Sequence, residues 1–257
     1  MLDSGRLDSG LPDPGLRDGR LRDRESLGGP HAVLWDMDGT LLDSERMWDV
    51  SLRELARHLG GELSDAVRQQ MVGGSMAGSM DLLFTALQLD PDPRAVAEAR
   101  SWLLARTGEL FDTGLSWRPG ARAALDLVHA AGLPMALVTN TGRDLTERAL
   151  GTLGRERFAA TVCGDEVPNG KPAADPYLRA AELLGIAPER CLAVEDSPTG
   201  VAAAEAAGCP VLVVPCEVAV AEGEARVFRE SLEGLSTGTL RAAWSAGFVA
   251  QPARMGQ

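Results

Sequence analysis

Short, continuous apolar runs recur along this chain and alternate with stretches that have helical patterns. The runs cover residues 32–36, 134–139, 161–164, 191–195 and 210–214. An apolar run without polar alternation indicates a strand that is covered on both faces, as in a parallel sheet between helices. The helical stretches between the runs cover 121–131, 144–153, 176–184 and 199–207. This alternation predicts an α/β protein with a doubly wound parallel sheet.

The interval after the first predicted strand breaks the alternation. It contains no strand signal, and its helical patterns cover 45–58, 64–71, 80–88 and 94–111, separated by glycine and proline clusters. A helical insert at this point lies above the carboxyl edge of the sheet, where ligands of open α/β sheets bind. We therefore expect a helical cap, with hinges at 41–44 and 112–119.

The predicted domains follow from this pattern. Residues 1–29 repeat short units rich in Gly, Asp and Arg, which cannot bury enough apolar surface to order themselves. We expect a disordered extension there, with an interaction tail as the alternative. The core domain is expected to comprise 30–43 and 114–257, and the cap domain 44–113.

Composition limits the partners of this 257-residue chain. Its net charge of -12 argues against nucleic acid or an anionic membrane surface as a partner, because phosphate groups would repel it. Apolar runs long enough to span a bilayer are missing from the sequence, and the first thirty residues lack the apolar core of a signal peptide. We expect a cytoplasmic protein that is monomeric by default.

The cysteines and histidines suggest no site. The four cysteines have no paired spacing and are interpreted as reduced core residues, with a disulfide or a metal site as the less favoured alternative. The three histidines are scattered, and they form neither a Ser-His-Asp arrangement nor a zinc-binding pattern.

Lysine usage is more informative. Of the 25 basic residues, Lys171 is the only lysine. An ammonium group is a compact point charge, whereas a guanidinium group is a planar fork, so this position suits a site that the fork does not fit. A lysine retained by chance is the alternative.

Asp36 and Asp38 directly follow the first predicted strand, in the segment Asp36-Met37-Asp38-Gly39-Thr40. Residues i and i+2 of a strand lie on the same side, so the side chains of both aspartates can point into the same space. Carboxylates this close raise each other's pKa unless a cation lies between them. An Asx-type turn is the alternative, because Asp-Gly is a common turn dipeptide.

Polar residues follow three other predicted strands. Thr139, Asn140 and Thr141 come after the second, and Lys171 lies in the loop after the third. Glu195 and Asp196, with Ser197, come at the end of the fourth. Each of these, taken alone, also fits a helix N-cap or a solvated loop residue. Because carboxyl ends of parallel strands meet at one edge, their joint occurrence predicts a site for a cation and a phosphate group.

These segments resemble the motifs of the haloacid dehalogenase superfamily, in particular its phosphatases with a helical cap after the first motif. The resemblance covers roughly residues 31–215. It is carried by the segments Asp36-Met37-Asp38-Gly39-Thr40, Thr139-Asn140, Lys171-Pro172 and Glu195-Asp196-Ser197-Pro198-Thr199-Gly200.

The resemblance implies roles in catalysis. Asp36 would be the nucleophile that forms an aspartyl-phosphate, and Asp38 would protonate the leaving oxygen and then deprotonate the attacking water. Thr139 and the backbone N–H of Asn140 would hold phosphoryl oxygens, while Lys171 would neutralise charge near the nucleophile.

The resemblance also implies a magnesium site. Mg²⁺ would be bound by the Asp36 carboxylate, the backbone carbonyl of Asp38 and the Asp196 carboxylate. Glu195 would lie next to the ion or reach it through water. An oxygen-only set of ligands suits this ion, which keeps several of its waters.

Other activities of the superfamily fit less well. Dehalogenases proper lack the second aspartate, so Asp38 argues for phosphate chemistry, and phosphonate-cleaving members need a cap lysine that this chain lacks. The β-phosphoglucomutases resemble the segment Leu42-Asp43-Ser44 but carry a cap histidine where Trp48 stands here, and a cap lysine that this chain lacks. A mutase remains the alternative function, as does a non-catalytic binding protein on the same fold.

The cap suggests a substrate class. Residues 43–48 look like the segment found in phosphatases that act on sugar and sugar-alcohol phosphates, which makes Glu45 and Trp48 candidates for substrate contact. Trp48 either packs on a sugar face or fills the core of the cap. Residues 71–80 form either a specificity loop or an ordinary helix–helix turn. The expected substrate is a small phosphorylated metabolite.

Overall fold

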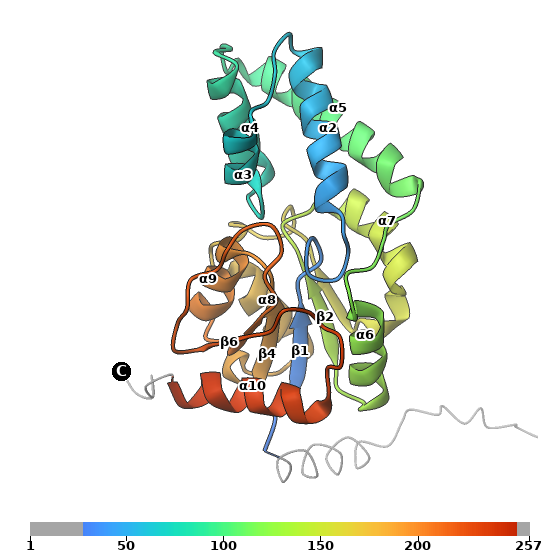
Figure 1. The fold of residues 1–257 in the computed structure, drawn as a ribbon, viewed down its shortest axis with the longest axis vertical. Helices are drawn as coiled ribbons and strands as arrows, with labels where there is room; N and C mark the ends of the chain where they lie inside the picture. Colours follow the sequence, from blue (N-terminus) through green and yellow to red (C-terminus); the bar gives the residue numbers. More distant parts are fainter. Residues whose placement is uncertain (1–27, 251–257) are drawn as a thin grey trace, which may run out of the picture.

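The computed structural model describes residues 28–250, so nearly all of the predicted N-terminal extension lies outside the described residues. A parallel sheet in the order β3-β2-β1-β4-β5-β6 forms their core (Figure 1). Each of the five predicted strand runs overlaps a strand of this sheet. The strands are β1 (Ala32–Trp35), β2 (Met135–Val138), β3 (Ala160–Val162), β4 (Cys191–Glu195), β5 (Val211–Val213) and β6 (Arg226–Phe228).

The register of the sheet brings three predicted motifs to one edge. Leu34 of β1 pairs with Ala136 of β2 on one side and with Ala193 of β4 on the other. The three strands therefore end close together, and the backbone N–H of Asp36 donates to the carbonyl of Val194 at 3.0 Å. The residues that follow β1, β2 and β4 share the carboxyl edge of the sheet.

Helices cover both faces of the sheet, as the continuous apolar runs require. Val33 and Trp35 point into a cluster with α6 (Ala121–Ala130), α7 (Arg143–Leu153) and α10 (Thr237–Ala250). Ala32 and Leu34 point into the opposite cluster with α8 (Asp175–Leu184) and α9 (Pro198–Ala206). The short turns η1 (Arg155–Arg157) and η2 (Pro188–Arg190) precede β3 and β4. The α/β fold class is confirmed.

Helices α2 (Glu45–His58), α3 (Asp65–Met71), α4 (Met76–Ala86) and α5 (Pro93–Asp112) follow β1 and stand above the sheet in Figure 1. They share a hydrophobic cluster of their own, whose buried members include Leu55, Met80, Leu83 and Leu103. We call these four helices and their connections the cap.

One cap helix begins earlier than predicted. The sequence pattern places its start at Met80, whereas α4 begins at Met76, because the Ser75 hydroxyl accepts the backbone N–H of Gly78 and caps the helix. The turn between α3 and α4 is therefore shorter than the predicted loop 71–80.

The structure adds a strand and a helix after β5. Strand β6 is an edge strand of three residues that includes Arg226 and the partly exposed Phe228, so it has no continuous apolar run. Helix α10 packs Leu240 and Ala243 into the core below β4 to β6 (Figure 1). Strand β6 thus extends the sheet at one edge, and α10 covers one of its faces.

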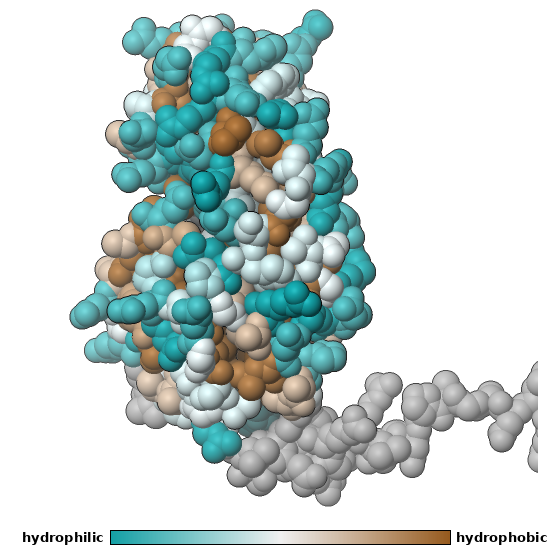
Figure 2. Space-filling model, turned by 45° about the vertical axis from the view of Figure 1, so that its right-hand side comes forward, coloured by the Kyte–Doolittle hydropathy of each residue, from teal (hydrophilic) through white to brown (hydrophobic). Residues whose placement is uncertain are grey.

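The surface is mainly polar. The face in Figure 2 is dominated by hydrophilic side chains over the cap, and the large hydrophobic residues that are exposed among the described ones, such as Val50 and Leu178, lie on separate helices. None of the helices within 28–250 has both the length and the apolar character that crossing a bilayer requires.

Candidate active site

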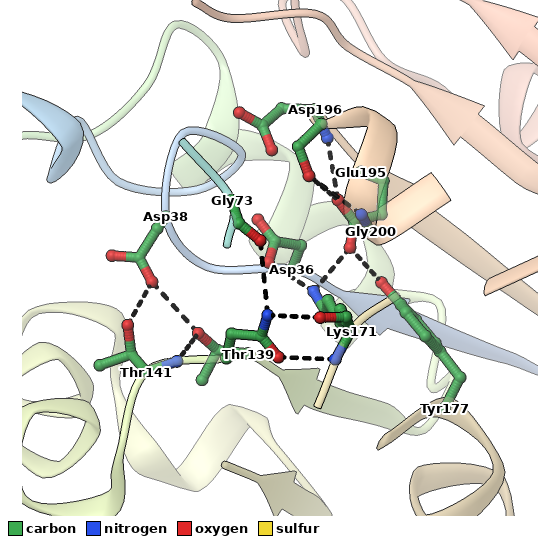
Figure 3. Close-up of polar contacts among 12 residues, drawn as sticks. Asp36, Asp38, Gly73, Thr139, Thr141, Lys171, Tyr177, Glu195, Asp196 and Gly200 are labelled. Carbon is green, nitrogen blue, oxygen red and sulfur yellow. Dashed lines mark hydrogen bonds and ion pairs between the residues drawn. The ribbon is translucent and has the colours of Figure 1, made fainter. Parts of the chain in front are cut away.

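The sole lysine lies between two acidic residues from neighbouring strands. The Nζ atom of Lys171, from the loop after β3, lies 2.7 Å from Asp36 Oδ1 and 2.6 Å from Glu195 Oε1 (Figure 3). Lys171 is 3% exposed and Glu195 is fully buried. The structure thus brings together three residues that the sequence predicted for this site.

Glu195 is held by donors on both carboxylate oxygens. Besides Lys171, its Oε1 atom accepts the hydroxyl of Tyr177, at 2.6 Å. Its Oε2 atom accepts the backbone N–H of Asp196 at 3.2 Å and the hydroxyl of Ser197 at 3.5 Å. Tyr177 was not predicted as a site residue. It is the only tyrosine of the chain, but its position in a helical stretch also fits core packing.

Two glycines let the backbone approach these carboxylates closely. Gly39 has a φ of +80°, and a Cβ atom there would lie 2.2 Å from Asp196 Oδ2. A Cβ atom on Gly200, in the first turn of α9, would lie 2.0 Å from the Glu195 carboxylate. A side chain at either position would displace an acidic residue of the site.

The acidic residues suit a bound cation. Carboxylate oxygens of Asp36, Glu195 and Asp196 lie within 4.8 Å of one another, and Asp36 Oδ2 is buried without a hydrogen-bond partner in the described chain. Burial and the neighbouring carboxylates raise the pKa of Asp36 and that of Asp196 well above their ordinary values. One lysine does not balance three buried carboxylates, and a divalent cation beside Asp36 Oδ2 would do so.

Asp38 lies beside this cluster and accepts four side-chain hydrogen bonds. Its Oδ2 atom accepts the hydroxyls of Thr139 at 3.1 Å and Thr141 at 2.8 Å, both from the end of β2 (Figure 3). Its Oδ1 atom accepts the Ser44 hydroxyl at 2.6 Å and the Trp48 indole N–H at 3.3 Å. Asp38 is therefore held between the core and the first helix of the cap.

The amide of Asn140 joins two loops of the site. Its Oδ1 atom accepts the backbone N–H of Lys171 at 2.8 Å, and its Nδ2 donates to the Lys171 carbonyl at 3.1 Å. The same Nδ2 donates to the carbonyl of Gly73, in the turn between α3 and α4, at 3.4 Å. The Asn140 side chain thus fixes the Lys171 backbone and contacts the cap.

A cavity of about 610 Å³ lies between the cap and the carboxyl edge of the sheet. Asp36, Asp38, Thr139, Asn140 and Lys171 line it from the core. Its apolar cap side is formed by Trp48, Leu52, Met71, Met76, Leu103 and Leu104. The turn at Gly73 to Ser75 also lines the cavity, as the specificity-loop interpretation requires.

Glu45 supplies a buried charge on the cap side. Its Oε2 atom accepts a hydrogen bond from Nη2 of Arg68, on α3, at 2.6 Å, and both residues line the cavity. Burial raises the pKa of Glu45 to about 7 although the ion pair with Arg68 opposes the shift. Both cap candidates, Glu45 and Trp48, therefore face the same cavity as the acidic cluster.

Comparison with known proteins agrees with this geometry. Residues 30–208 match the family model described as haloacid dehalogenase-like hydrolase. Phosphorylated carbohydrates phosphatase of Thermotoga maritima is 31% identical over 178 residues, which cover 69% of this chain and 81% of that protein. Hexitol phosphatase A of Escherichia coli is 34% identical over 185 residues, which cover 70% of this chain and 81% of that protein.

A solved structure adds the fold to this comparison. The crystal structure of CbbY from Rhodobacter sphaeroides in complex with phosphate superposes with a TM-score of 0.69 at 27% identity, covering 80% of this chain and 96% of that one. The family match spans strands β1 to β4, the cap and all four motifs. The chain belongs to the haloacid dehalogenase-like hydrolases and is a phosphoric monoester hydrolase of that family.

Proposed function

We propose that the protein is a Mg²⁺-dependent phosphatase that hydrolyses a small sugar or sugar-alcohol phosphate through an aspartyl-phosphate on Asp36. One observation carries this proposal. Asp36 is buried and shares a cavity with Asp38. One of its carboxylate oxygens contacts Lys171, and the other has no hydrogen-bond partner among residues 28–250. A nucleophile next to a proton donor is the arrangement that two-step phosphoryl transfer requires.

In the first step, an Asp36 carboxylate oxygen attacks phosphorus and the ester P–O bond breaks. Asp38 transfers its proton to the leaving oxygen, so that a neutral alcohol departs. Lys171 keeps the attacking carboxylate oriented, and its positive charge partly neutralises the negative charge of the phosphoryl group. The products of this step are the alcohol and the aspartyl-phosphate.

In the second step, Asp38 is a carboxylate and accepts a proton from water. The water oxygen attacks phosphorus, and the bond between phosphorus and the Asp36 oxygen breaks. This releases inorganic phosphate and regenerates the Asp36 carboxylate. The four hydrogen bonds to Asp38 fix the position from which it serves both steps.

Asp36, Asp196 and the backbone carbonyl of Asp38 would hold Mg²⁺, with Glu195 beside it. When bound, the ion supplies positive charge that neutralises the phosphoryl oxygens. The fit rests on the buried carboxylates around Asp36 Oδ2, because their combined negative charge is larger than the single positive charge of Lys171.

The cap side of the cavity supports a polyol substrate. The Trp48 ring and the neighbouring leucines suit a carbon skeleton, while Glu45, Arg68 and Ser75 offer groups that bind hydroxyls. Two relatives named as phosphatases of carbohydrate phosphates and hexitols point the same way. The cap has no lysine, which argues against the mutase alternative.

Phosphate release from nitrophenyl phosphate tests the proposal. We expect activity that EDTA abolishes and added Mg²⁺ restores, and a loss of about a thousandfold or more in the Asp36→Asn variant, which keeps the size of the side chain. Equal rates for the two proteins would refute the nucleophile assignment. A panel of sugar, hexitol and nucleoside monophosphates, compared by kcat/KM, tests the substrate class.

A further inference from the structure

The only tyrosine of this chain and its only lysine contact the same oxygen atom. Tyr177 donates its hydroxyl hydrogen to Glu195 Oε1 at 2.6 Å, and Lys171 Nζ lies 2.6 Å from that oxygen. The Lys171 ammonium also lies 5.2 Å from the centre of the Tyr177 ring. Figure 3 shows Tyr177 reaching from α8 to the Glu195 carboxylate. The three residues form one buried group behind the nucleophile.

Packing alone does not account for the hydroxyl of Tyr177. The residue is fully buried in an apolar cluster with Leu34, Ala180 and Val201, where a phenylalanine ring would pack equally well. A buried hydroxyl needs a partner, and this one makes a short, charge-assisted hydrogen bond to Glu195. The hydroxyl therefore serves the carboxylate.

Glu195 is fully buried and is not among the described residues that line the cavity, whereas Lys171 and Asp36 line it. Gly200 of α9 packs directly against its carboxylate, which closes the remaining side. Among the described side chains, Lys171 connects Glu195 with the proposed nucleophile, because its ammonium is shared between Glu195 and Asp36.

We propose that Tyr177 is a positioning residue that sets how Lys171 is shared between Glu195 and Asp36. The Tyr177 O–H satisfies part of the negative charge on Glu195 Oε1, and the ring covers one side of the ammonium. Without the hydroxyl, Glu195 attracts Lys171 more strongly and weakens its contact with Asp36. This inference rests on the proposed function, because it concerns the charge next to the proposed nucleophile.

The Tyr177→Phe variant tests the proposal, since it removes the hydroxyl and keeps the ring. With nitrophenyl phosphate we expect kcat to fall on the order of tenfold and KM to stay within about twofold, because the lost charge balance matters most in the transition state. Thr107→Val is the matched control. It also removes a buried hydroxyl hydrogen bond, the 2.9 Å contact with Ser51 in the cap, and neither residue lines the cavity.

Thermal unfolding of both variants separates structure from catalysis. We expect a lowered Tm in both and a lowered kcat in Tyr177→Phe alone. A Tyr177→Phe protein with lowered Tm and wild-type kcat would overturn the proposal, because the hydroxyl would then serve stability only.

A double-mutant cycle with Glu195→Gln tests the route of the effect. If Tyr177 acts through Glu195, the double variant loses no more kcat than Glu195→Gln alone, whereas additive losses would overturn this route. The Asp36→Asn variant is measured alongside. A wild-type rate in Asp36→Asn refutes the proposed function itself, while a normal Asp36→Asn loss with an unaffected Tyr177→Phe refutes only the role of Tyr177.

Discussion

Asp38 accepts hydrogen bonds from the core and from the cap, and its contact with Trp48 connects the proposed proton donor to the first cap helix. The indole N–H donates to Asp38 Oδ1 at 3.3 Å, while the ring packs edge to face against Phe111 with centres 6.3 Å apart. Trp48 therefore packs in the cap, as one of the two sequence interpretations expects, and it also lines the cavity; contact with a sugar face stays a prediction. Its hydrogen bond to Asp38 is a contact that no sequence pattern reveals.

The Trp48→Phe variant isolates that bond, because a phenyl ring keeps the aromatic packing and lacks the N–H. For an alkyl phosphate, whose leaving oxygen needs a proton, we expect kcat/KM to fall about fivefold. With nitrophenyl phosphate, kcat/KM should fall less, since the leaving group departs without protonation. Trp102→Phe is the control, because Trp102 stacks on His58 at 5.2 Å, away from the cavity. Equal losses on the two esters would contradict the role of Trp48.

Buried thiols make stability sensitive to alkaline pH. Burial raises the pKa of Cys191 to about 12 from an ordinary value of 9.0. Above pH 9 the unfolded chain therefore releases a proton that the folded protein keeps, so the free energy of unfolding falls as pH rises toward 12. We expect Cys191 to account for about 1 kcal/mol of the loss between pH 8 and pH 10 in urea unfolding. Parallel pH profiles for the wild type and Cys191→Ala would contradict this.

Single residues differ in how well the sequence predicted them. Lys171 was identifiable because it is unique, and Asp36 and Glu195 because they end buried strands. Tyr177 was missed, since its role depends on a hydrogen bond to Glu195, 18 positions further along the chain. Such contacts follow from the packing of helices on the sheet, which local patterns do not encode.

Among the elements, the turn between α3 and α4 is the part of the cap that contacts two core motifs. The carbonyl of Gly73 accepts a hydrogen bond from the side-chain amide of Asn140. Gly73 has a φ of +67°, and a Cβ atom there would lie 2.9 Å from the side chain of Ser197. The sequence left this segment open between a specificity loop and a plain turn. In the structure it is a short turn that lines the cavity.

Gly73→Ala should disturb the docking of this turn, because alanine disfavours the positive φ and its methyl group meets Ser197. We expect KM to rise about tenfold with a smaller change in kcat, measured with the preferred sugar phosphate. Gly151→Ala on α7 is the control, since a Cβ atom there meets no atom within 4 Å and φ is ordinary. An unchanged KM in Gly73→Ala would show that the turn does not contribute to substrate binding.

Strand and helix boundaries show where sequence patterns are weak. Strands β1 to β5 were predicted because continuous apolar runs mark strands that helices cover on both faces. Strand β6 was not predicted, because an edge strand needs little burial. Two of its three residues are Arg226 and Phe228, both partly exposed. The early start of α4 depends on the Ser75 cap, a signal that the small and glycine-rich segment after it obscures.

For the molecule as a whole, the parallel sheet and the helical cap place one cavity where four motifs meet. The order of strands and helices was predictable because the alternation of apolar runs and helical stretches allows few topologies. The closeness of the cap to the motifs was not, since it depends on contacts such as that of Asn140 with Gly73. The central claim for this assembly is that Asp36 carries the phosphoryl group during turnover.

Rapid acid quenching of a turnover mixture, followed by peptide mass analysis, tests that claim most directly. With Mg²⁺ and an excess of substrate, we expect the peptide that contains Asp36 to gain the mass of one phosphoryl group, and the corresponding Asp36→Asn peptide to gain none. A phosphoryl group found on another residue, or Asp36→Asn turnover at the wild-type rate, would contradict the account.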